Sequence, residues 1–156
     1  MTTDATTAER SAVRRLGVAW VMLWIALAAH VFDEAMTGFL AVYNPTVLAL
    51  RERLGFWPMP TFEFREWLAG LSVGIVTRAT LSPFAFRNAR WLRPLFYFCA
   101  IVVGVLNALG HMATTIFGHP LSGIGMPRPS PGFYSSPMLL AAAVYALGQL
   151  RRTRQT

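Results

Sequence analysis

The sequence predicts an all-α fold: an integral membrane four-helix bundle with a short interfacial helix in its first outer loop. Composition is the first reason. Of the 156 residues, 54% are hydrophobic and only 13% are charged, whereas soluble domains carry about 25% charged residues. A soluble domain of this size cannot bury such an apolar excess. The outer surface of the bundle is therefore expected to face lipid.

Four apolar segments are the second reason. A helix that crosses a hydrocarbon core of about 30 Å needs roughly 20 residues. The segments at 16–39, 64–84, 94–117 and 133–150 approach that length. They predict a four-span transmembrane domain over residues 16–150, with tails at 1–15 and 151–156. The protein is expected in the cell membrane, as a multi-pass protein.

The arginine distribution is the third reason, and it predicts the orientation. Every one of the fourteen cations is arginine, and the net charge is +7. With four spans, nine arginines fall on the side of the two tails and the middle loop, and four fall on the other side. The positive-inside rule then places both termini in the cytoplasm. Because the arginines lie between apolar segments rather than along one face, we expect no nucleic-acid partner.

The two outer connections carry further predictions. In the first, Pro45 precedes a segment in which Leu50 and Leu54 lie opposite Arg51 and Arg53. This pattern predicts a short amphipathic helix at the interface over residues 45–54, with Pro45 at its first position. The second connection, residues 119–131, is dense in glycine and proline. We expect it to cap a cavity.

The residues able to do chemistry form two groups within the spans. His30, Asp33 and Glu34 share one helical face at positions i, i+3 and i+4, and Asn107 and His111 share another at i and i+4. Ionisable groups in hydrocarbon are costly, so they normally face the bundle interior and find partners. All five are candidate catalytic residues.

A depth calculation brings the two groups together. At 1.5 Å per residue, His30 lies about 22 Å beyond Arg15 and Glu34 about 28 Å. Asn107 lies about 21 Å beyond Arg93, and His111 about 27 Å, on a helix that runs in the same direction. We therefore predict that His30, Glu34, Asn107 and His111 converge in one pocket. Asp33 is expected to line it or to support His30 from behind.

The string from His30 to Glu34 resembles the motif of the HXXEE domain family, small bacterial multi-pass membrane proteins. The Asn107 and His111 pair, and Pro131-Gly132 before a serine-rich helix start, are similar to that family's second half. The resemblance covers about residues 16–150. It implies the architecture and the candidate residues but no reaction. The sequence departs from the motif at Asp33, whose carboxylate reaches one methylene less far than the glutamate in the family name.

The leading functional hypothesis is an intramembrane enzyme acting on an apolar or lipid-like substrate. In one version a divalent metal is held by His30, Glu34 and His111, with Asp33 beside them, because two histidines and carboxylates suit zinc, iron or manganese. In a metal-free version, Glu34 or Asp33 exchanges protons with His30. The alternatives are a scaffold, accessory subunit or transporter whose polar cluster only joins helices, and a haem ligated by His30 and His111.

Overall fold

The computed structural model describes residues 2–119, 125 and 127–153, which contain helices and no strand. The elements, in chain order, are α1 (Thr2–Thr37), α2 (Leu40–Leu54), α3 (Phe64–Thr80), α4 (Ser82–Phe86), η1 (Arg90–Leu92), α5 (Arg93–Phe98), η2 (Cys99–Leu106), α6 (Asn107–Phe117) and α7 (Ser136–Arg152). The all-α prediction is confirmed for these ranges. Within the predicted cap at 119–131, residues 120–124 and 126 lie outside the described residues.

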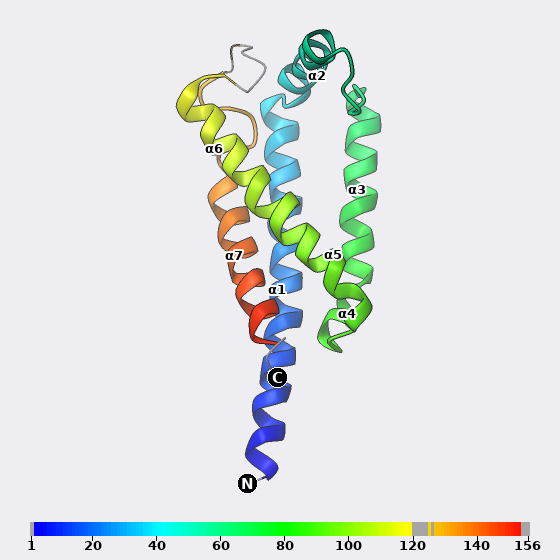
Figure 1. The fold of residues 1–156 in the computed structure, drawn as a ribbon, viewed down its shortest axis with the longest axis vertical. Helices are drawn as coiled ribbons and strands as arrows, with labels where there is room; N and C mark the ends of the chain where they lie inside the picture. Colours follow the sequence, from blue (N-terminus) through cyan, green and yellow to red (C-terminus); the bar gives the residue numbers. More distant parts are fainter. Residues whose placement is uncertain (1, 120–124, 126, 154–156) are drawn as a thin grey trace.

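Helix α1 is the centre of the molecule. It contacts α3, α4, η2 and α7, and α3 and α7 lie on opposite sides of it (Figure 1). The stretch from η1 to α6 crosses this arrangement obliquely, and α2 lies across one end. The start of α1 and the end of α7 lie at the opposite end. Residues distant in sequence therefore meet along α1.

In the part of the chain that the structure describes, two helical stretches are long and apolar enough to cross a membrane: Thr7–Thr37 and Arg90–Phe117. They correspond to the first and third predicted spans. The second and fourth predicted spans also contain helices, α3 and α7, but each has 17 residues. At 1.5 Å per residue these are about 26 Å long. The structure thus supports a helical protein with two candidate membrane-spanning helices.

The predicted start of the first loop helix was wrong: α2 begins at Leu40 rather than at Pro45. Gly38 ends α1 with a φ of +76°, a conformation that glycine adopts without steric cost. The chain then turns at Phe39 straight into α2, which leaves Pro45 inside the helix. Proline there removes one backbone hydrogen bond, and the Asn44 side chain exchanges two with the backbone of Phe62. The predicted end at Leu54 is confirmed.

The third helical stretch changes its winding immediately before the candidate site. Residues Cys99–Leu106 form a π-helix, and α-helical winding resumes at Asn107. Gly104 in this segment packs so closely on Ala143 of α7 that a side chain on the glycine would meet it. Small residues allow helices to approach closely in membranes. This contact fixes α6 against α7, and with it the position of His111.

Candidate metal centre

Three of the predicted residues meet in the interior, where α1 faces α6. His30, Glu34 and His111 have exposed fractions of 0%, 5% and 7%. The Oε1 atom of Glu34 lies 3.6 Å from Nε2 of His30 and 3.1 Å from Nε2 of His111. The two imidazole rings pack edge to face with centroids 4.9 Å apart. Two nitrogens and one carboxylate oxygen are thereby gathered within 4.8 Å of one another.

Asp33 is connected to His30 by hydrogen bonds that Ser135 makes with both residues. Ser135 donates its backbone N–H to Oδ2 of Asp33 at 2.8 Å, and its Oγ lies 2.8 Å from the same oxygen. The Oγ atom also lies 2.8 Å from Nδ1 of His30. A hydroxyl has one hydrogen to donate, and a hydrogen bond to a charged carboxylate is stronger than one to a neutral imidazole. Ser135 therefore donates to Asp33 and accepts from the Nδ1–H of His30.

This arrangement fixes the tautomer of His30. With the proton on Nδ1, a neutral imidazole carries its lone pair on Nε2. That nitrogen is buried and has no hydrogen-bond partner among the described residues. It faces the same oxygen of Glu34 that His111 approaches. A buried polar atom without a partner is unfavourable and calls for an explanation, such as an ion.

Gly132 covers the triad formed by His30, Glu34 and His111. Its φ is +79°, and a Cβ at this position would lie 3.0 Å from Cγ of Glu34 and from Cε1 of His30, and 3.1 Å from Cε1 of His111. Its N–H donates to Oγ1 of Thr37 at 3.2 Å. The loop around Pro131 and Gly132 thus covers the triad, and both the positive φ and the close contacts at Gly132 disfavour any larger residue there.

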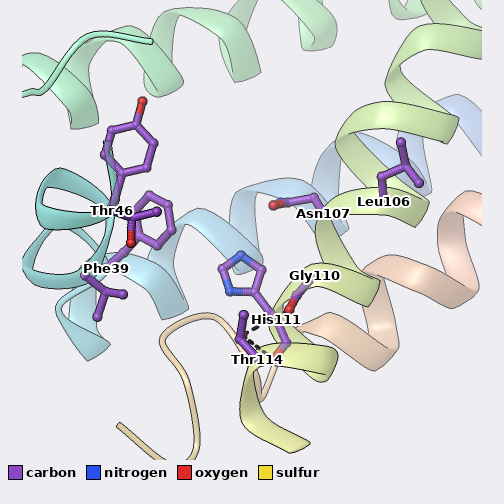
Figure 2. Close-up of a pocket in the computed structure, with 9 residues that line it drawn as sticks. Phe39, Thr46, Leu106, Asn107, Gly110, His111 and Thr114 are labelled. Carbon is purple, nitrogen blue, oxygen red and sulfur yellow. Dashed lines mark hydrogen bonds between the residues drawn. The ribbon is translucent and has the colours of Figure 1, made fainter. Parts of the chain in front are cut away.

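Asn107 does not meet the triad. It lines a neighbouring cavity of about 220 Å³ together with His111. Phe39 and Thr46 form the facing wall from the α2 side, as Figure 2 shows, and Tyr43 also lines the cavity. Of the four side chains predicted to converge, His30, Glu34 and His111 thus meet in the triad, and Asn107 shares the adjoining cavity with His111. His111 belongs to both places, since its Nε2 faces Glu34 while its ring lines the cavity.

The sequence did not identify two groups of residues at the site: the serine beside His30, and the residues near the start of α2 that line the cavity. Ser135 was noticed only as part of a serine-rich helix start, and its contact with His30 spans 105 positions of the chain. Phe39, Tyr43 and Thr46 line the cavity because α2 starts early. Burial raises the pKa of the Tyr43 phenol, which keeps it a neutral group that donates to the carbonyl of Pro60 at 3.0 Å.

The donor set and spacing suit a divalent transition metal. With metal–ligand bonds of about 2.0–2.1 Å, tetrahedral ligands lie about 3.4 Å apart. The separations of 3.1 and 3.6 Å from Glu34 bracket that value. Two histidines and one glutamate form catalytic zinc sites, and two histidines and a carboxylate hold non-haem iron. The haem alternative is wrong, because the rings of His30 and His111 are packed against each other and leave no room for a macrocycle.

No protein-family model, curated protein or solved structure matches the chain.

Proposed function

We propose that this protein is a membrane-embedded, metal-dependent enzyme that acts on an apolar or lipid-like substrate. His30, Glu34 and His111 are the metal ligands. The observation that carries the proposal is the buried Nε2 of His30, which has no hydrogen-bond partner among the residues that the structure describes and lies close to the other two ligand atoms. In a cluster that served only to hold helices together, this nitrogen would make a hydrogen bond, because a buried polar atom without one costs free energy.

The surface of the bundle supports the membrane environment. Large apolar side chains remain exposed on all four long helical stretches. Along α1 they recur at helical spacing on one face: Val18, Met22, Ile25, Phe32 and Met36. Contiguous exposed apolar surface of this kind is rare on soluble monomers. We therefore propose that α3 and α7 also cross the bilayer, giving the four-span bundle, because each packs along α1.

The orientation and the family belong to the same proposal. Nine arginines against four favour cytoplasmic termini, and the string His30 to Glu34 resembles the HXXEE family. Reporter fusions after residue 156 and beside Arg90 should both give a cytoplasmic signal. A signal from the opposite compartment at either position would overturn the topology.

Each residue of the site has a distinct task. A divalent metal supplies Lewis-acid chemistry and activates water at neutral pH. Asp33 and Ser135 hold His30 in the tautomer whose Nε2 lone pair faces the ligand position. Gly132 brings backbone rather than a side chain over the triad, which excludes bulk water from it. His111 connects the triad with the cavity, where a substrate can be held.

Zinc binding tests the proposal. The full chain, purified in detergent, should bind about one Zn²⁺ per molecule, measured by elemental analysis and by titration. Glu34→Gln keeps the shape of the side chain but removes the anionic ligand. It should weaken zinc binding by more than the roughly 10–100-fold lost when an outer partner of a ligand is removed.

The matched control is Glu52→Gln, the same substitution at an exposed position of α2. It should bind zinc like the parent chain. The proposal is overturned if the parent binds no metal under these conditions, or if Glu34→Gln binds as tightly as Glu52→Gln. Far-ultraviolet circular dichroism on the same samples establishes that each variant is folded.

A further inference from the structure

The cavity beside the triad opens toward the outside of the bundle. Leu106 lines it and is nevertheless 58% exposed, so this side chain marks the edge where the cavity meets the surroundings of the protein. The inner end of the cavity is formed by His111. A molecule lying against the exposed face of the third helical stretch can therefore reach His111 without crossing the protein core.

Two polar groups in the cavity walls have no partner in the described protein. The Oγ1 atom of Thr46 is buried and makes no hydrogen bond. The amide of Asn107 points into the cavity opposite Thr46 (Figure 2), and no described residue hydrogen-bonds to it. The Thr46 hydroxyl is covered by the protein, whereas the Asn107 amide faces the cavity and can donate to an acceptor oxygen there.

The rest of the lining is apolar or already bonded. Phe39 and Val42 contribute apolar surface, and Thr114 donates to carbonyls of its own helix. Neither an arginine nor a carboxylate lines the cavity. In the metal-free chain, a phosphate or carboxylate head buried here would have no cation to pair with, and an unpaired buried charge is strongly unfavourable.

The volume limits what the cavity can hold. About 220 Å³ is below the roughly 300–1,000 Å³ of sites that enclose a whole drug-sized molecule. The cavity therefore accommodates only the polar part of a lipid-like molecule. Its apolar part remains outside, past Leu106.

We propose that this cavity is the substrate subsite of the metal centre, and that it binds the uncharged carbonyl group of a neutral ester or amide lipid such as an acylglycerol. Asn107 donates to the carbonyl oxygen, and the acyl chain leaves beside Leu106 into the bilayer. This inference rests on the proposed function, since it assigns His111 both to the metal and to the subsite wall.

Photo-cross-linking tests the subsite. The probe is a monoacylglycerol with a diazirine on its acyl chain close to the ester, incorporated into vesicles that contain the full chain. Cross-linked peptides should map to residues 39–46 and 106–114. On the metal-free chain, prepared with a chelator, the matched lysophosphatidic acid, with the same chain and diazirine, should label these segments about tenfold less, because its charge would be buried without a partner.

Two tryptophan variants on one helical stretch separate the cavity from the general lipid surface. Leu106→Trp fills the opening and should abolish labelling of residues 39–46. Leu109→Trp is the control, since Leu109 is 45% exposed and does not line the cavity, and it should leave labelling unchanged. Equal labelling by the two probes, or equal labelling of the two variants, overturns the inference.

Zinc binding measured on the same preparations distinguishes the two proposals. Glu34 does not line the cavity, so Glu34→Gln should lose zinc and keep the labelling pattern. A parent chain that binds zinc without the expected pattern refutes the subsite alone. A parent chain that shows the pattern but binds no zinc refutes the metal centre, and with it the link between the cavity and a reaction.

Discussion

The two ends of the bundle are stabilised in different ways. At the end near the start of α1 the interior is apolar: the rings of Trp20 and Phe96 pack edge to face with centroids 4.9 Å apart, and Leu92 and Leu150 are buried beside them in the same core. At the other end the interior holds the triad, and its contacts are polar. The first end is stabilised mainly by apolar packing, although Trp20 also donates its indole N–H to the carbonyl of Arg78 at 2.9 Å, whereas the second end depends on paired donors and acceptors.

The difference separates an end that is held by packing from the end at which we propose that a metal binds. Apolar side chains gain contacts throughout the core without leaving any group unsatisfied. In the triad region, Ser135, Asp33 and Thr37 pair nearly every polar atom, yet Nε2 of His30 stays without a partner. Substitutions at the apolar end should therefore reduce stability alone. Substitutions at the polar end should reduce the affinity for metal by more than the loss of packing contacts accounts for.

The largest expected effect on stability is at the apolar end. Phe96→Ala removes the contact with Trp20 and leaves a cavity, and should cost about 3–5 kcal/mol of unfolding free energy. Zinc affinity of the folded protein should not change.

The control is Phe98→Ala on the same helix, since Phe98 is 52% exposed. Its cost in unfolding free energy should stay at about 0.5 kcal/mol, as for other surface changes. Thermal unfolding in detergent measures both. A large loss of zinc affinity in Phe96→Ala would show that the two ends are coupled.

A smaller effect is expected at Gly132, where the polar end is most crowded. Gly132→Ala places a methyl group on the triad and imposes a φ of +79° on alanine, and should cost about 2–3 kcal/mol. Gly38→Ala is the control, because Gly38 has a φ of +76° and nothing within 4 Å of a Cβ. It should show only the conformational cost, about 1 kcal/mol.

The comparison of these two variants isolates the crowding at the triad. Gly132→Ala should also weaken zinc binding, whereas Gly38→Ala should not. Equal stability and equal zinc affinity in the two variants would mean that the loop does not hold Gly132 against the ligands.

The smallest effect is expected when only the support of a ligand is removed. Ser135→Ala takes away the hydroxyl that accepts from His30, and should weaken zinc binding about 10–100-fold. Ser136→Ala is the matched control, since its hydroxyl donates to the carbonyl of Gly132 at 2.7 Å without touching His30. Titration with zinc compares the two. If both variants lose the same affinity, Ser135 acts on the loop rather than on the tautomer of His30.

The sequence was most informative where neighbouring positions decide the outcome. His30 and Glu34 lie on one face because any helix brings positions i and i+4 together. Matching depths correctly paired Glu34 with His111. Depth did not distinguish the triad from the cavity beside it, which Asn107 lines together with His111, because depth along a helix does not say which way a side chain points.

The sequence by itself determined that the chain is helical, that it contains two stretches long and apolar enough to cross a membrane, and which ionisable residues need partners. These follow from composition and from the period of the helix, which are local properties. Only the tertiary structure decided that Ser135 supports His30, that Gly132 covers the triad, and that Asn107 faces a separate cavity with Thr46. Those contacts join residues far apart in the chain, and they depend on how closely helices approach and rotate when small residues meet.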